Sequence, residues 1–264
     1  MPSLKKYFNY CQGITFDDDV QNNYFFAECS SLAYHRGKFA KEQFNSIGFK
    51  SHTYLSVRGA QVHIVSNTGH IIIAFRGTEP QKLSDIKADI TLFKRPAKSG
   101  QEGWVHMGFQ KEVDKLWNSI LDVLPKTTKK QIWITGHSLG GAMATICASR
   151  LEHLNPKLYT YGSPRVGGEI FCKGLKAEHK RFVNNNDVVP KFPLWIMGFT
   201  HHGELCYINH YGNMRNGDSY WQRFKDKMRG RWAALKKWQF FDGFKDHSSS
   251  RYSNKLRNLW SAIV

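Results

Sequence analysis

The chain has 264 residues, of which 41% are hydrophobic and 14% aromatic, and this composition excludes a disordered or fibrous protein. Its 38 Lys and Arg residues outnumber 21 Asp and Glu residues, and the formal net charge of +17 favours anionic partners. No zinc-finger spacing or RNA-binding strand motif accompanies this charge, so we expect no nucleic-acid partner.

The cysteines and the N-terminal residues bear on the cellular compartment. The five cysteines are odd in number and lack a CxxC pair: Cys11, Cys29, Cys147, Cys172 and Cys206. This pattern favours free thiols, leaves one or two disulfides open, and predicts neither a metal nor a cofactor. No signal-peptide pattern and no apolar run of spanning length occur. If Met1 is the natural start we expect a cytoplasmic protein, whereas a removed leader would make it secreted.

Two elements are predicted in the first third of the chain. Residues 17–34 begin with acidic side chains and then carry apolar residues at helical spacing, which predicts an amphipathic helix covering one face of a sheet. The strand-like runs 62–65 and 71–75 are joined by Asn67-Thr68-Gly69, a turn signal. These runs therefore predict a β-hairpin.

Strands and helices alternate through the middle of the chain. The apolar run 131–135 predicts a strand buried on both faces, and helical periodicity occurs at 113–124 and again at 142–154. This alternation predicts an α/β fold with a mostly parallel central sheet covered by helices on both faces. No linker interrupts it, so we expect residues 1–264 to form a single domain.

The Gly-His-Ser-Leu-Gly-Gly string at residues 136–141 follows a predicted strand and precedes a predicted helix. A serine on such a sharp turn is held in a strained backbone conformation, with its hydroxyl at the helix N-terminus. An ordinary glycine-rich turn is the alternative, but the strand, turn and helix context favours Ser138 as a nucleophile. A serine hydroxyl needs a base to take its proton and a carboxylate to orient that base.

Two strings after Ser138 offer these groups. Residues 181–190 read as a short strand that enters a polar loop, and Asp187 at its exit is the candidate carboxylate, although an Asx turn would explain it as well. Residues 245–252 lie near the C-terminus and contain His247, the candidate base.

Six motifs in this order resemble the class 3 triacylglycerol lipases, a family that includes fungal-type lipases and feruloyl esterases. They are Phe-Arg-Gly-Thr at 75–78, Val-His-Met-Gly-Phe at 105–109, the string at 136–141, Tyr-Gly-Ser-Pro-Arg-Val-Gly at 161–167, Asn-Asp-Val-Val-Pro at 186–190, and Asp-His-Ser at 246–248. The resemblance implies an α/β-hydrolase fold.

The resemblance also implies a role for each matched residue. Ser138 would be the nucleophile, Asp187 the orienting acid and His247 the general base, and the N–H groups of Thr78 and Leu139 would form an oxyanion hole. The implied substrates are lipid esters, either triacylglycerols or phospholipids cleaved as by a phospholipase A1. A feruloyl or short-chain esterase, an amidase or peptidase, and an inactive membrane-binding relative are the alternatives.

Four further features remain: two histidines that match positions of the family, a segment at the place of the family's lid, and a basic aromatic segment. By analogy with the family, we expect His106 and His201 to be structural, and residues 81–96 to form either a mobile lid or a fixed border of the cleft. Residues 220–244 interleave aromatic and basic side chains at helical spacing. That segment would dock on an anionic lipid surface or pack its aromatic face on the sheet.

Overall fold

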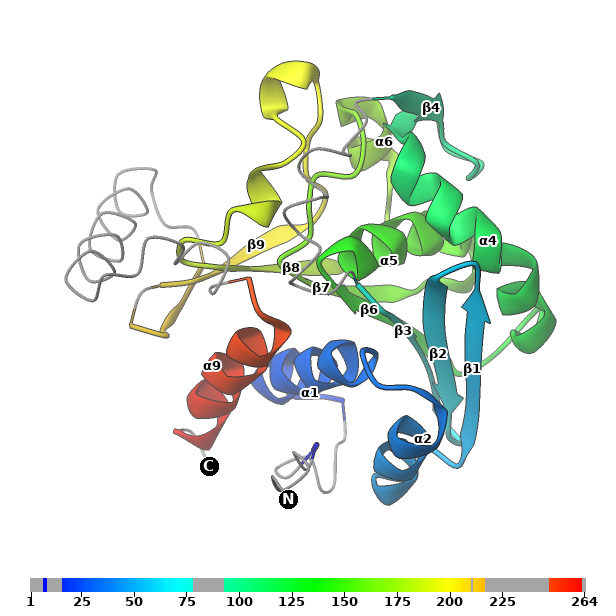
Figure 1. The fold of residues 1–264 in the computed structure, drawn as a ribbon, viewed down its shortest axis with the longest axis vertical. Helices are drawn as coiled ribbons and strands as arrows, with labels where there is room; N and C mark the ends of the chain where they lie inside the picture. Colours follow the sequence, from blue (N-terminus) through cyan, green and yellow to red (C-terminus); the bar gives the residue numbers. More distant parts are fainter. Residues whose placement is uncertain (1–6, 9–15, 78–92, 210, 217–246, 263–264) are drawn as a thin grey trace.

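The computed structural model describes residues 7–8, 16–77, 93–209, 211–216 and 247–262 (Figure 1). Its main sheet has the strand order β1-β2-β3-β6-β7-β8-β9-β10. The strands are β1 (Ser51–Val57), β2 (Ala60–Ser66), β3 (His70–Phe75), β6 (Gln131–His137), β7 (Lys157–Tyr161), β8 (His179–Asn184), β9 (Glu204–Ile208) and β10 (Met214–Asn216). Strands β3 to β9 of this sheet run parallel, and β1, β2 and β10 pair antiparallel at its edges. The predicted mostly parallel sheet is confirmed.

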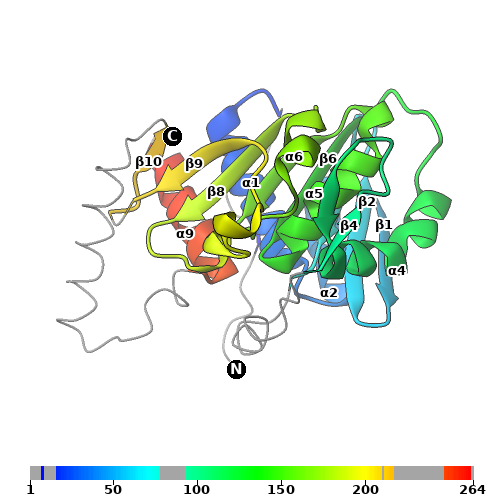
Figure 2. The ribbon, with the colours of Figure 1, turned by 90° about the horizontal axis from the view of Figure 1, so that it is seen from above.

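Helices cover both faces of this sheet (Figures 1 and 2). One face carries α1 (Asp19–Leu32), α2 (Gly37–Ser46) and α9 (Ser249–Ser261), and the other carries α4 (Met107–Val123), α5 (Leu139–Arg150) and α6 (Glu169–Gly174). The described residues also form the short 3₁₀ turns η2 (Glu152–Leu154), η3 (Val189–Lys191) and η4 (Trp195–Met197), and β4 (Lys94–Pro96) pairs with β5 (Trp104–His106) apart from the main sheet.

The sheet separates two hydrophobic cores, and β3 shows how. Ile71, Ile73 and Phe75 belong to the core under α4 and α5, while Ile72 and Ala74 belong to the core under α1 and α9. Because successive side chains of a strand point to opposite faces, a strand buried on both sides must be apolar throughout. The predicted hairpin of β2 and β3 is confirmed, and the Asn67 side chain accepts hydrogen bonds from the N–H groups of Gly69 and His70 within its turn.

The predicted helix at 17–34 differs from the amphipathic helix that was expected. The Asp18 carboxylate caps α1 by accepting from the N–H groups of Val20 and Gln21, but every residue from Gln21 to Leu32 is buried. Helix α9 packs against α1, and Phe8 and Phe16 of the preceding segment contact Phe25 of α1, so no solvent-facing stripe is left. Glu28 stays satisfied there because it accepts a hydrogen bond from the Ser253 hydroxyl of α9.

The two helices predicted at 113–124 and 142–154 begin earlier than periodicity indicated. Helix α4 begins at Met107 because the His106 side chain caps it, accepting from the Phe109 N–H. Helix α5 begins at Leu139, directly after Ser138. No helix in the described ranges is long and apolar enough to cross a bilayer. Four cysteines, Cys29, Cys147, Cys172 and Cys206, are buried free thiols, and Cys11 lies outside those ranges.

Candidate active site

Ser138 occupies the turn between the end of β6 and the first residue of α5. Its backbone has φ 59° and ψ −129°, a combination that costs an L-residue of order 1–3 kcal/mol. The Ser138 N–H donates to the Tyr161 carbonyl at 2.9 Å, which ties the turn to the end of β7. Strain of this kind persists only where the surrounding structure holds it, and it points to a functional position.

Two glycines of the same string let this turn approach its neighbours. A Cβ added at Gly136 would lie 2.3 Å from the Gly140 carbonyl carbon, and one added at Gly140 would lie 2.5 Å from the Phe75 oxygen. Both distances are shorter than any real carbon contact, so the helix could not start this close to β3 and β6 with side chains there. The glycine spacing of the string is therefore a steric requirement of the turn.

Asp187 and His247 form a buried pair, as the chain order of the candidates implies. His247 Nδ1 donates to the Asp187 carboxylate, 2.8 Å from Oδ2 and 3.0 Å from Oδ1, and both side chains are fully buried. A carboxylate only accepts, so the proton of neutral His247 lies on Nδ1 and the lone pair on Nε2. Within the described part of the chain, His247 Nε2 is buried and has no hydrogen-bond partner. This nitrogen is thus available to accept a proton.

A third residue, which the sequence analysis did not identify, joins the pair. The Tyr252 hydroxyl, on α9, donates to Asp187 Oδ2 at 2.6 Å and accepts from the Asn184 N–H at 2.9 Å. The Val189 N–H donates to the other oxygen, Asp187 Oδ1, at 2.9 Å. These two donors, from α9 and η3, therefore fix the plane of the carboxylate that faces His247.

His137, the residue before Ser138, connects the turn to His247. The two imidazole centroids lie 4.5 Å apart, and His137 Nε2 donates to the backbone carbonyl of His247. The Tyr34 hydroxyl donates to His137 Nδ1 at 2.8 Å, the acceptor that this tautomer leaves. Burial, together with the neighbouring His247, holds the pKa of His137 well below its usual value. A neutral His137 thus places His247 beside the turn that carries Ser138.

Gly162, in the string at 161–167, lies against the same pair. It has φ 59°, and a Cβ added to it would lie 2.8 Å from Asp187 Oδ2 and 2.9 Å from His247 Nδ1. Only glycine allows the end of β7 to come this close. The string at 161–167 therefore lies directly behind the acid and the base.

Of the two expected oxyanion-hole donors, the structure describes Leu139 but not Thr78. Leu139 is the first residue of α5, where an N–H group has no acceptor within its own helix, so this donor is available at the turn. Thr78 lies outside the described residues, as do residues 81–92 of the expected lid and the whole segment 220–244. At the end of the expected lid, Phe93 precedes the exposed strand β4, which Lys94–Pro96 form.

The two other matched histidines lie in supporting positions. His106 is buried and caps α4, with its ring stacked on Phe109 at 4.1 Å. His201 Nε2 donates to the Pro190 carbonyl at 2.8 Å, and burial holds the pKa of His201 well below its usual value. Both arrangements agree with the structural roles that we expected.

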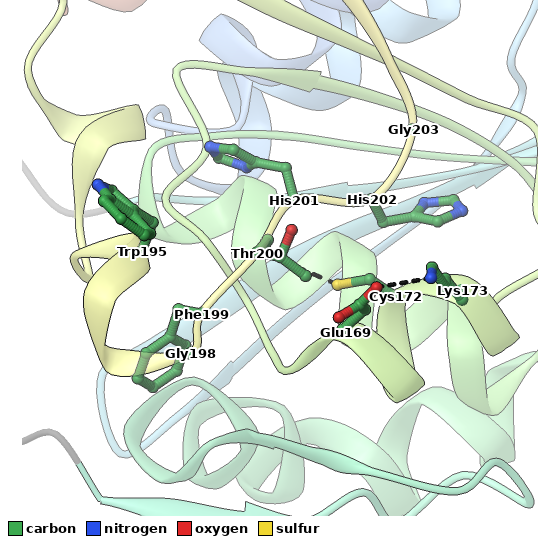
Figure 3. A pocket seen from close by; sticks show the side chains of 10 residues that line it. All are labelled: Glu169, Cys172, Lys173, Trp195, Gly198, Phe199, Thr200, His201, His202 and Gly203. Atoms are coloured by element: carbon green, nitrogen blue, oxygen red, sulfur yellow. Dashed lines mark hydrogen bonds and ion pairs between the residues drawn. The ribbon is translucent and has the colours of Figure 1, made fainter.

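A pocket of about 420 Å³ lies between α6 and the loop before β9 (Figure 3). It is lined by Glu169, Cys172, Lys173, Trp195, Gly198, Phe199, Thr200, His201, His202 and Gly203. This lining includes none of Ser138, Asp187 and His247, so the pocket is distinct from the serine turn. Across the described ranges, no group of three or more His, Cys, Asp or Glu side chains is placed to hold a metal ion.

Removal of the Tyr252 hydroxyl is expected to lower both the stability of the protein and its kcat. Tyr252→Phe takes a donor from a buried carboxylate and an acceptor from the Asn184 N–H, so we expect the free energy of unfolding to fall by about 2 kcal/mol. If Asp187 orients a catalytic base, kcat on a soluble ester should fall about tenfold as well. Urea unfolding and steady-state kinetics measure the two effects.

Tyr207→Phe is the matched control for this variant, because the buried Tyr207 hydroxyl donates to Asn185 rather than to Asp187. It should lower stability and leave kcat unchanged. Equal kcat values for both variants and the wild type would show that Tyr252 has no part in orienting Asp187.

Known proteins resemble this chain in sequence and structure. Residues 72–197 match the model of a family described as lipase (class 3). A lipase of Rhizomucor miehei is 34% identical over 154 residues, which make up 52% of this chain and 41% of that protein. The secreted mono- and diacylglycerol lipase A of Penicillium cyclopium is 38% identical over 93 residues, 33% of this chain and 30% of the relative. These matches therefore span less than half of the length of either relative.

A solved structure agrees with the sequence matches. It is described as a triacylglycerol lipase whose catalytic centre is formed by a serine protease triad, and it is 28% identical with a TM-score of 0.60. The superposition covers 72% of this chain and 80% of that one. The expected α/β-hydrolase fold is thereby confirmed.

Proposed function

Because this chain belongs to the class 3 lipase family, we propose that it is a serine hydrolase that cleaves carboxylic esters of lipids through an acyl-enzyme on Ser138. One observation carries the proposal: a serine strained at positive φ directly follows His137, whose ring lies 4.5 Å from His247 of a buried Asp187–His247 pair, and His247 Nε2 has no partner among the described residues. A nucleophile, a base and an orienting acid are the three groups that acyl transfer requires.

The proposed reaction follows from the tautomer of His247. Its Nε2 takes the proton of the Ser138 hydroxyl as the oxygen attacks the ester carbonyl, and Asp187 stabilises the imidazolium that forms. The negative oxygen of the tetrahedral intermediate is held by the Leu139 N–H and, by family analogy, that of Thr78. His247 then gives its proton to the leaving alcohol, and a water activated by the same nitrogen hydrolyses the acyl-enzyme.

Neutral or phosphorylated glycerolipids are the proposed substrates. The names of the relatives support this class, since they include a lipase and a mono- and diacylglycerol lipase. We further propose that the basic segment 220–244, with its interleaved aromatic residues, assists contact with anionic lipid. A feruloyl or short-chain esterase would use the same groups on a smaller acid.

A labelling and chain-length experiment tests the proposal. Nitrophenyl esters from acetyl to palmitoyl and an emulsified triglyceride are offered to the protein before and after treatment with diethyl nitrophenyl phosphate, which phosphorylates activated serines. We expect one equivalent of nitrophenolate, a phosphoryl group on the Ser138 peptide by mass spectrometry, and loss of turnover on long-chain esters.

The peptide that contains the buried Ser149 of the same helix is the internal control and should stay unmodified. A preference for short acyl chains would replace the lipase by the esterase. Absence of both labelling and turnover would contradict the enzyme and favour an inactive membrane-binding relative.

A further inference from the structure

The elements η4, α6 and β4 lie at one end of the molecule (Figure 1), and exposed apolar side chains belong to or adjoin each of them. Trp195 and Ile196 are 71% and 68% exposed, and Ile170 of α6 and Phe93 beside β4 are 63% and 62% exposed. Leu194, at the start of the same turn, is partly exposed as well. We call residues 194–196 with Ile170 and Phe93 the docking tip. Exposed apolar groups gathered in this way mark an interaction surface.

The three parts of the docking tip are neighbours in space. Trp195 lines the same pocket as Glu169, which precedes Ile170 on α6 (Figure 3). On the other side, a Cβ added at Gly198, just after η4, would lie 3.5 Å from the Nζ of Lys94, the residue after Phe93. The turn, the helix and the strand therefore present one surface.

The turn is fixed in this exposed position. The Arg165 side chain donates to the carbonyls of Lys191 and Pro193, and the Arg165 N–H donates to the Phe192 carbonyl at 2.7 Å. Beyond the turn, the Thr200 N–H donates to the Gly167 carbonyl at 2.8 Å. With both of its ends held, the turn cannot fold Trp195 and Ile196 into the core. Within the described part of the chain, both side chains therefore stay exposed.

The charges around the docking tip indicate what binds. Lys94 and Arg95 are exposed on β4, and Lys94 Nζ lies 4.2 Å from the Trp104 ring centroid. The carboxylate of Glu169 on α6 is paired with Lys173 at 2.5 Å, and within the described residues neither Lys94 nor Arg95 forms an ion pair. Aromatic and aliphatic side chains flanked by cations, on a chain of net charge +17, fit an anionic lipid interface.

The position of the docking tip fits such an interface. Leu194 comes seven residues after Asp187, in the loop that leaves the C-terminal end of β8. Ser138 follows the C-terminal end of β6, a strand parallel to β8 in the same sheet. The docking tip and Ser138 thus lie at the same end of the sheet, so a membrane bound at the tip would face the serine.

We propose that the docking tip inserts into bilayers that contain anionic phospholipid and so anchors the catalytic end of the molecule to its substrate. This proposal rests on the proposed lipid-ester function. The apolar side chains enter the interface, and Lys94 and Arg95 meet the phosphate groups.

The test measures binding to phosphatidylcholine vesicles with and without phosphatidylserine by flotation. All variants are made in the Ser138→Ala chain, so that hydrolysis cannot alter the vesicles. Trp195→Ser combined with Ile196→Ser should lower partitioning onto the anionic vesicles at least about tenfold. Lys94→Gln with Arg95→Gln should also lower it about tenfold, with little effect on pure phosphatidylcholine.

Leu121→Ser with Val123→Ser is the matched control, because these residues are also exposed and apolar, at 46% and 37%. They lie at the far end of α4, roughly 20 Å along the helix from Met107, whose N–H contacts the Phe93 carbonyl. This control should bind anionic vesicles like its parent.

Equal partitioning of the tip variant and its parent would overturn the proposal. So would a parent that is dimeric in sedimentation and becomes monomeric only in the tip variant, since a second copy would then cover the surface. In the chain that retains Ser138, the tip variant should cleave a soluble acetyl ester at the wild-type rate. Tip-dependent vesicle binding by a chain that cleaves no ester would instead refute the proposed function and leave the docking surface standing.

Discussion

Replacing Ser138 by alanine is expected to lower kcat on a soluble nitrophenyl ester by about 10⁵-fold or more, to the level left by binding and the oxyanion donors alone. The attacking oxygen is lost, and His247 Nε2, which has no partner among the described residues, then has no hydroxyl to deprotonate. Initial rates with purified protein measure the effect. Ser149→Ala, a change of the same kind in a buried serine of the same helix, should keep the wild-type rate.

The strain at position 138 allows the loss of activity to be separated from a loss of stability. Alanine keeps the penalty of φ 59°, whereas glycine adopts this conformation freely. Ser138→Gly should therefore be inactive like Ser138→Ala yet more stable by about 1 kcal/mol in urea unfolding. Activity that survives in either variant would contradict the assignment of Ser138 as the nucleophile.

The serine turn could be predicted because its determinants are local. A buried strand, glycines at fixed offsets and a helix start all occur within a short stretch around Ser138, and the structure gives each glycine a steric reason. Asp187 and His247 could also be proposed, because each lies in a short polar string after the serine. A serine nucleophile requires a base and a carboxylate, and this requirement directed the search to these strings.

Tyr252 and His137 were missed because their contacts are long-range. Nothing in the local sequence shows that the Tyr252 hydroxyl reaches Asp187, 65 residues earlier, or that His137 donates to the backbone of His247, 110 residues later. Both contacts exist because α9 packs on α1 and the sheet, a tertiary arrangement with no periodic signal. The same packing explains why α1 is buried all round although its sequence predicted an exposed stripe.

Asp187→Asn is expected to lower kcat by about 10⁴-fold while leaving the protein folded. An asparagine amide turned toward His247 would donate to Nδ1, so the imidazole proton would move to Nε2, the nitrogen that must accept the serine proton. The Tyr252 and Val189 groups would still find an oxygen on the new side chain, but only one. The variant should therefore lose the base while the serine turn stays in place.

Asp114→Asn separates this effect from the general loss of a paired carboxylate. Asp114 accepts from Lys98 at 2.8 Å and from Arg150 at 2.6 Å, and these cations lower the pKa of its carboxyl although partial burial raises it. Its neutral variant should lose stability and keep kcat. If instead the two asparagine variants lost activity to the same extent, Asp187 would hold the fold together without orienting His247.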